Sequence, residues 1–284
     1  PGCAPGCAQG AARVRFRRIV FGLENASSAP ALAAATDLAL ATEATLLGLF
    51  VEESDLLQLA ALPFAREVSF PAAPGRSLDP ESMNRALRAR AHAARESLAR
   101  SLAGRSIAWE FDVVRGSALS AVLEVAGESD LAVVSLAAGA LVGAGRRREA
   151  TLRGLKGVRR PLLLMSERAA PRAPIVAVLT PDAAARETVD ALGTLARHYG
   201  GGLSILILPP TVPDADLLAA IDRLGVDARV RTLADASPAR LIDEIALERP
   251  GLLVVCGDDL AWEAGEALVG LATCPLLLLP AAPR

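Results

Sequence analysis

Glycines followed by consecutive arginines mark the part of this sequence whose residue types suit the binding of an anion. Gly139, Gly143 and Gly145 come after a short apolar run, and residues 146–148 are all arginine. Glycines let the backbone turn tightly enough for several N–H groups to point at one ligand, and arginine offers paired donors to phosphate. The segment therefore has the residue types of a phosphate-binding loop.

Nucleophilic and metal-dependent catalysis lack the residues that they need. The sequence has two histidines, His92 and His198, and both fall within amphipathic helical patterns far from strand ends. A catalytic serine or cysteine needs a nearby histidine and an orienting acid, and a metal needs ligands at close spacing. We therefore expect no catalytic residue, no metal and two solvated histidines on helix surfaces.

The four cysteines predict no disulfide framework in a chain of this length. Cys3 and Cys7 lie in a Gly- and Pro-rich start, for which we predict a flexible tail over residues 1–16, with a zinc site as the alternative. Cys256 follows one apolar run and Cys274 precedes another. These two positions predict buried thiols.

Composition favours an α/β protein with two domains. The 284 residues suffice for two cores, and a chain with 52% hydrophobic but only 3% aromatic residues is typical of parallel sheets covered by alanine-rich helices. The formal net charge of -2 gives no field that would attract nucleic acid or an anionic membrane. Since no apolar run approaches the roughly 18 residues of a membrane span, we expect a soluble cytoplasmic protein.

Strand-like and helix-like patterns alternate through the first half. A strand at residues 17–23 precedes an alanine-rich helix that ends near Glu43, and Pro80 opens a long helix after Asp79. Further strands are predicted at residues 45–51, 107–114, 131–135 and 161–165.

The second half repeats this order of elements. "SALSAVLEVAGESDLAVVS" matches "SPARLIDEIALERPGLLVVC", and "RRPLLLM" matches "TCPLLLLP". We place the boundary near Ala170, so residues 17–169 and 170–284 form two domains. Strands joined by helical crossovers predict a doubly wound parallel sheet in each, with ligands at the carboxyl ends of the strands.

Taken in order, residues 17–53, residues 113–135 and the closing "PLLLM" and "PLLLLP" resemble the universal stress protein family in its tandem form. The resemblance covers nearly everything after residue 16. It implies two Rossmann-like domains with five-stranded sheets, paired through their last strands as a pseudo-twofold unit. A homodimer is an additional expectation for the assembly.

Many members of that family bind ATP through three features, each of which has a counterpart position here. These are an Asp after the first strand, a G-x-x-G loop after the fourth strand, and a Gly-Ser or Gly-Thr pair that opens the next helix. The first repeat has Glu24 for the Asp and a G-x-x-x-G-x-G spacing, and Arg147, Glu149 and their neighbours replace the Gly-Ser pair. A glutamate at the start of a helix repels phosphate.

The second repeat departs further from the family's pattern. Thr180 replaces the Asp, the glycine loop is shortened, and Asp258 and Asp259 put negative charge where phosphate would lie. We expect this repeat to bind no nucleotide.

We interpret the glycine and arginine segment as the remains of a phosphate-binding loop. The chain is then a non-catalytic binding or regulatory module of the stress response, without a cofactor, that acts on an unknown protein or small molecule. The alternative is an ATP- or AMP-binding stress protein with slow ATP hydrolysis, whose altered site uses Glu24, Gly139, Gly143, Arg146 and Arg147. A regulatory domain tied to a transporter is the third interpretation.

Two further features have open roles. The insertion at residues 54–80, with Arg66 and Glu67, either covers a pocket or subunit surface or packs over the first sheet. Arg115 and Gly116 fall at a strand-to-helix turn on the expected ligand side, where the arginine either contacts an anion or is an exposed neighbour of a turn glycine.

Overall fold

The computed structural model divides the chain into two compact units, Phe16–Ala170 and Pro171–Arg284, each of which we describe by itself. The residues that the structure describes are 16–23, 29–53, 66–67, 76–77, 80–116, 118–136, 160–166, 169–180, 185–209, 215–235, 237–257, 268 and 274–280.

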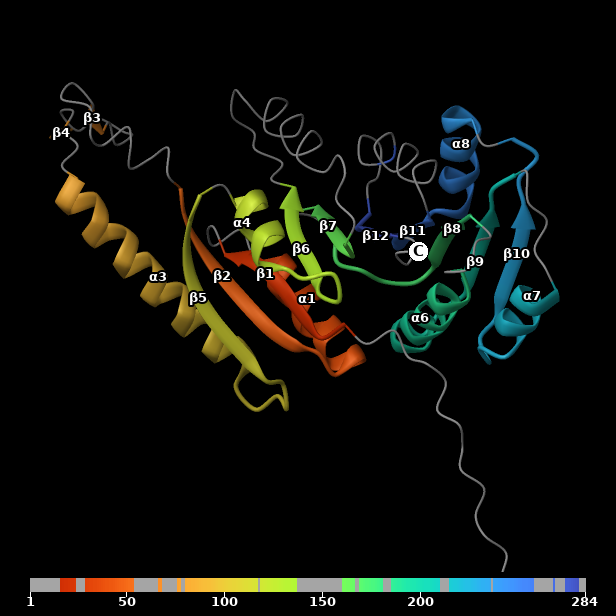
Figure 1. The fold of residues 1–284 in the computed structure, drawn as a ribbon, viewed down its shortest axis with the longest axis horizontal. Helices are drawn as coiled ribbons and strands as arrows, with labels where there is room; N and C mark the ends of the chain where they lie inside the picture. Colours follow the sequence, from red (N-terminus) through yellow and green to blue (C-terminus); the bar gives the residue numbers. More distant parts are fainter. Residues whose placement is uncertain are drawn as a thin grey trace, which may run out of the picture. The chain divides into compact units, whose positions relative to one another are not determined.

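The first unit is built on a parallel sheet (Figure 1). Within the described residues it has five strands in the order β7-β6-β1-β2-β5, and all neighbouring pairs are parallel. The apolar runs form the inner strands because both of their faces are covered. The strands are β1 (Arg18–Leu23), β2 (Thr45–Glu53), β5 (Trp109–Gly116), β6 (Leu131–Leu136) and β7 (Leu162–Ser166).

Helices cover both faces of this sheet. A Cβ atom on Gly48 of β2 would lie 2.9 Å from Leu98 Cδ2, so α3 packs closely over that face. A Cβ atom on Gly22, which points to the other face, would lie 3.4 Å from Val122 of α4. The helices of this unit are α1 (Ala29–Thr42), α3 (Pro80–Leu102) and α4 (Ala118–Val125).

Helix α3 begins where the sequence predicts, and a glycine follows its end. Pro80 occupies its first position, where a missing N–H costs no helical hydrogen bond. Gly104, with φ 77°, follows its last turn and adopts the left-handed conformation that glycine tolerates. Its buried side chains lie on one stripe, at Leu87, Ala91, Leu98 and Leu102.

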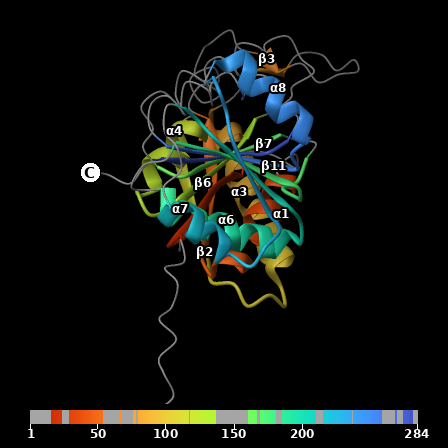
Figure 2. The ribbon, with the colours of Figure 1, turned by 90° about the vertical axis from the view of Figure 1, so that its right-hand side faces the viewer.

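The second unit repeats the arrangement. Its strand order is β10-β9-β8-β11-β12, again with parallel neighbours, and α8 lies on the face opposite α6 and α7 (Figures 1 and 2). The strands are β8 (Ile175–Leu179), β9 (Leu203–Ile207), β10 (Ala228–Thr232), β11 (Leu252–Gly257) and β12 (Leu276–Pro280), and the helices are α6 (Ala185–Tyr199), α7 (Ala215–Asp222) and α8 (Pro238–Glu248).

A charged network fixes the edge strand of the second unit to its covering helix. Arg231 of β10 lies 2.8 Å from Glu244 and 3.3 Å from Glu248, both on α8. Glu248 also accepts a hydrogen bond of 2.9 Å from Ser204 on β9. Glu244 is only 5% exposed, so the arginine supplies a charge that this carboxylate needs once it is out of water.

The structure confirms the predicted α/β class and extends two elements. Strand β2 continues two residues past the predicted end, to Glu53, and β5 runs to Gly116. In the insertion, two-residue strands β3 (Arg66–Glu67) and β4 (Arg76–Ser77) pair antiparallel, which the sequence did not predict. The predicted pairing of the two repeats through their last strands stays a prediction.

Candidate functional site

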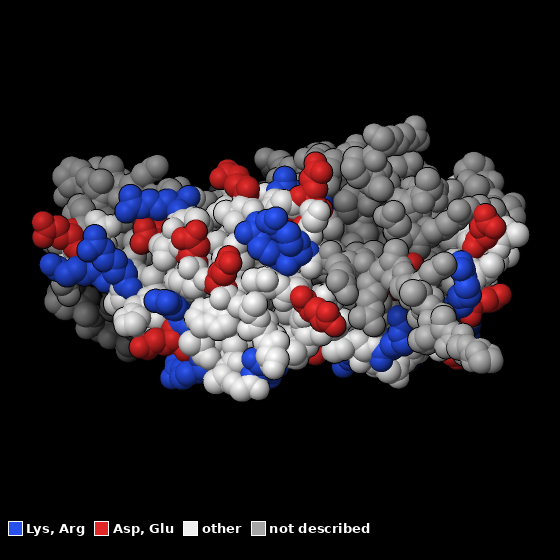
Figure 3. Space-filling view, turned by 60° about the horizontal axis from the view of Figure 1, so that its bottom comes forward, with Lys and Arg blue, Asp and Glu red and all other residues white. Residues whose placement is uncertain are grey.

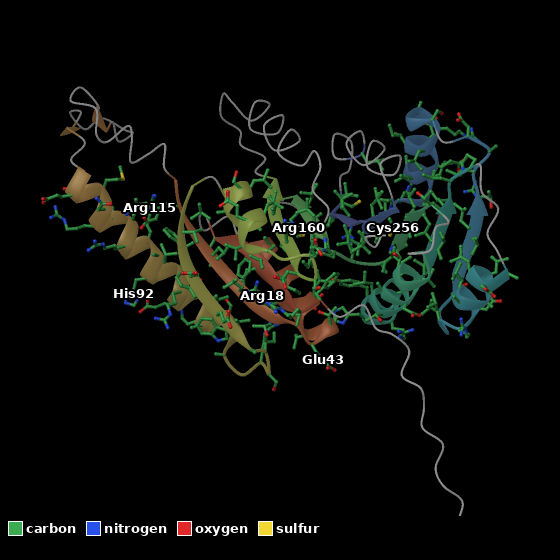
Figure 4. All side chains as sticks on the ribbon, viewed as in Figure 1. Arg18, Glu43, His92, Arg115, Arg160 and Cys256 are labelled. Carbon is green, nitrogen blue, oxygen red and sulfur yellow. The ribbon has the colours of Figure 1, made fainter. Side chains whose placement is uncertain are left out.

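The carboxyl ends of the parallel strands form the edge at which doubly wound domains bind ligands. In the first unit, an ion pair between neighbouring strands lies at this edge. Glu52 of β2 and Arg115 of β5 are register partners, and Arg115 Nε donates a hydrogen bond to Glu52 Oε2 over 3.0 Å. Figure 4 shows Arg115 near the upper end of β5.

The two partners differ in their access to solvent. The Arg115 side chain is 69% exposed, whereas the Glu52 side chain is 11% exposed. Gly116 follows with φ 145°, a conformation that favours glycine, and α4 begins two residues later at Ala118. The strand-to-helix turn is therefore where the sequence predicts it, but its arginine is held by a carboxylate.

The second unit has no counterpart of this pair. Ile19 is level with Leu46 in one sheet, as Ile175 is with Leu203 in the other. Counting along the strands from these positions places Pro209 and Ala234 where the first unit has Glu52 and Arg115. Neither residue carries a charge, so this edge offers no arginine there to an anion.

Thr180 lies at the carboxyl end of β8, as the repeat predicts. Its N–H donates a hydrogen bond of 3.3 Å to the carbonyl oxygen of Cys256, which extends the strand ladder. Its buried Oγ1 has no hydrogen-bond partner among the described residues. A hydroxyl in this place cannot supply the negative charge that the family's Asp supplies.

The remaining predicted site residues fall outside the described part of the chain. This holds for the counterpart of Thr180 in the first repeat, for the glycine and arginine segment, and for the two acidic residues after β11. These residues are Glu24, Gly139, Gly143, Gly145, Arg146, Arg147, Arg148, Glu149, Asp258 and Asp259. Their predicted roles stay predictions.

The histidines and the second pair of cysteines lie where the sequence predicts. His92 and His198 are both exposed on helices, and His92 Nε2 lies 3.8 Å from Glu96 Oε1. Cys256 and Cys274 are buried thiols, and burial raises the pKa of Cys274. Among the described residues, no group of three or more His, Cys, Asp or Glu side chains is placed to hold a metal.

Sequence reasoning missed Glu52 as the partner of Arg115. The available signal was that "TLLGLFVEE" and "EFDVVRG" both carry a charged residue at or next to their carboxyl end, on strands predicted to run in parallel. Because 63 residues separate the partners, only the strand register shows that these two charges are level.

No helix in the described part of the chain is long and apolar enough to cross a membrane. No protein-family model matches the sequence. A search of curated proteins also found no match.

Solved structures share the fold over 94% of this chain. A universal stress protein from Archaeoglobus fulgidus has a TM-score of 0.62 and 12% identity, with 94% of this chain and 99% of that chain covered. A protein of unknown function from Pseudomonas aeruginosa PAO1 has a TM-score of 0.59 and 14% identity, with 94% of each chain covered. A putative universal stress protein from Pseudomonas aeruginosa UCBPP-PA14 has a TM-score of 0.57 and 14% identity, with 94% of each chain covered.

Proposed function

Because this chain has the fold of universal stress proteins in their tandem form, we propose that it acts in the stress response as a non-catalytic binding or regulatory module. We also propose that neither unit binds ATP or AMP. A cytoplasmic location and a protein or small-molecule partner belong to the same proposal.

The observation that carries the proposal is the pairing of Arg115 with Glu52. An arginine at the carboxyl edge of a sheet is the kind of side chain that could hold a phosphate group. Here its Nε is 3.0 Å from a carboxylate that is itself almost buried. A phosphate that met the remaining Nη groups of Arg115 would lie beside the negative charge of Glu52, so the pair opposes nucleotide binding.

The second unit supports the proposal in a different way. At Pro209 and Ala234, the equivalent positions, and at Thr180 after β8, the second unit has neither an arginine nor an acid. The sequence places two aspartates, Asp258 and Asp259, directly after β11, and their charge would repel phosphate.

Measuring the nucleotide that stays bound to the chain during purification tests this proposal. The purified chain is denatured, and ATP and AMP in the supernatant are separated and quantified against protein concentration. We expect amounts far below one nucleotide per chain. Stoichiometric nucleotide would contradict the proposal, and its loss in Arg147→Glu would establish the alternative site in the first repeat.

A further inference from the structure

Helix α3 carries a line of basic side chains on its solvent side. Arg85, Arg88, His92 and Arg95 are all exposed and follow one another at intervals of three, four and three residues. Side chains at this spacing lie on one face of an α-helix. We call these four residues the basic stripe. Figure 4 shows His92 on the side of α3 away from β5, and Figure 3 shows several basic side chains, with acidic ones between them, on the left, where α3 lies in Figure 1.

The arginines of the basic stripe have few partners. In the described part of the chain, neither Arg88 nor Arg95 forms an ion pair or a side-chain hydrogen bond. Arg85 donates only to the uncharged Ser82 Oγ, at 2.9 Å. Of the acidic residues nearby, Glu96 lies 3.8 Å from His92, and Glu81 precedes Arg85 by four residues. Arg88 and Arg95 are therefore without a charged partner among the described residues.

This uncompensated charge is unusual for the chain as a whole. Helix α3 contains five arginines and two glutamates, whereas the whole chain has a formal net charge of -2. Soluble surfaces commonly intersperse the two signs, because like charges at neighbouring helical positions destabilise a helix. The opposite side of α3 packs against the sheet, where Leu87 and Leu98 are buried. The solvent side is thus free to meet a partner of opposite charge.

We propose that the basic stripe docks an acidic helical segment of a protein partner. Ten residues separate Arg85 from Arg95, which corresponds to about 15 Å along the helix. A helical segment with glutamates at intervals of three or four residues presents carboxylates over the same length and with the same periodicity. Such a partner would pair with each free guanidinium. The proposal does not depend on whether the carboxyl edge of the sheet binds nucleotide.

The acidic residues around the stripe favour a short protein segment over nucleic acid. Glu81, in the first turn of α3, and Glu96 stand at the two ends of the stripe. A nucleic acid backbone continues past a patch of this length and would bring phosphates close to both glutamates. A short acidic segment can end within the stripe, and the chain's negative net charge gives no long-range attraction for a polyanion.

A labelled helical peptide tests the proposal by fluorescence anisotropy at low ionic strength. The probe is an alanine-based peptide of roughly four turns with glutamate at every third or fourth position, and its control has glutamine at those positions. We expect the full chain to bind the glutamate peptide and not the glutamine peptide. The double variant Arg88→Glu/Arg95→Glu should weaken binding by about tenfold or more, because two attractions become repulsions.

A matched control variant tests whether binding depends on the position of the arginines or only on the net charge of the chain. Arg90→Glu/Arg100→Glu makes the same charge change on the same helix, but Arg90 and Arg100 lie roughly 120° or more around the axis from Arg88 and Arg95. We expect this variant to bind within about threefold of the parent chain. Circular dichroism checks folding, and Arg88→Gln/Arg95→Gln replaces the first variant if it does not fold.

Three results would overturn the proposal. The first is an absence of binding to the glutamate peptide, or equal binding of the glutamine peptide. The second is an equal loss in the two double variants, which would show that only total charge matters. The third is tighter binding of a DNA duplex of similar length than of the glutamate peptide, which would identify nucleic acid as the partner.

Discussion

Arg18 Nη2 lies 2.8 Å from Asp130 Oδ2, and this ion pair joins β1 to the start of β6 at the amino edge of the first sheet. Asp130 is 1% exposed and also accepts a hydrogen bond of 2.9 Å from the N–H of Gly127. Burial raises the pKa of Asp130, but the hydrogen bonds from Arg18 and Gly127 and the positive charges of Arg18 and Arg17 together lower it more, and the net shift is downward. The pair thus stabilises the folded chain through its ionised form.

Replacing this carboxylate should destabilise the first unit in a pH-dependent way. Since the folded-state pKa of Asp130 is lowered, its stabilisation is present above the unfolded value of about 3.9 and is lost as pH falls through the folded value. Asp130→Asn should lower the free energy of unfolding by about 3 kcal/mol at pH 7, because it leaves Arg18 without its partner. Urea unfolding from pH 7 downward should show this difference shrink below about pH 4.

The control is Asp112→Asn, on the exposed edge strand β5, where we expect a change within about 0.5 kcal/mol. A difference between Asp130→Asn and the parent chain that is constant over the whole pH range would contradict the linkage argument.

At the corresponding place in the second unit, a backbone hydrogen bond stands where the first unit has the ion pair. The strand register places Pro174 and Gly251 where the first unit has Arg18 and Asp130, and the N–H of Gly251 donates a hydrogen bond of 2.8 Å to the carbonyl oxygen of Pro174. A Cβ atom on Gly251 would lie 2.4 Å from the carbonyl oxygen of Arg172. The segment before β8 therefore occupies the space that a side chain would need.

A methyl group added at residue 251 should destabilise the second unit. Gly251→Ala should lower the free energy of unfolding by about 1–3 kcal/mol, because the clash is with backbone atoms that cannot turn aside. Gly202→Ala is the matched control, since the nearest atom to its added Cβ would be Asp227 O at 4.0 Å. Thermal or urea unfolding of both variants measures the difference, and equal stabilities would show that the segment at Arg172 relaxes freely.

The predicted pairing of the two repeats has its own test. Two apolar last strands, β7 and β12, would each be left with an open edge if their units stood alone. Residues 171–284 expressed without the first unit should therefore aggregate or self-associate in sedimentation velocity. A soluble monomer of residues 171–284 that unfolds cooperatively would count strongly against the pairing.

The sequence is sufficient to predict the fold because the strands and helices of the two sheet-containing units carry local signals. Strands such as β8 are short apolar runs, and Pro80 and Gly104 mark the limits of α3. The repeated order of elements then determines the class. The two-residue strands β3 and β4 carry no such signal, since their pairing depends on the insertion around them.

The site is less predictable because it depends on contacts between distant residues. Arg115 is identifiable from its position before a turn glycine, but its partner Glu52 becomes apparent only from the register of β2 with β5. Asp130 likewise acquires its role from Arg18, 112 residues earlier. Whether a charged side chain faces a ligand or another side chain depends on its burial and on the strand register. Neither of these can be read from the sequence alone.

Calorimetric titration of the full chain with ATP, at low and at high salt, tests the central claim most directly. We predict no heat of binding at either salt concentration, since Arg115 is held by Glu52 and the second unit has no charge at the equivalent positions. Binding that weakens with salt and disappears in Arg147→Glu would support the altered site in the first repeat, because exposed charges are screened within about 8 Å at physiological ionic strength. Tight binding that is insensitive to salt would contradict the account, because it requires a cradle of backbone N–H groups.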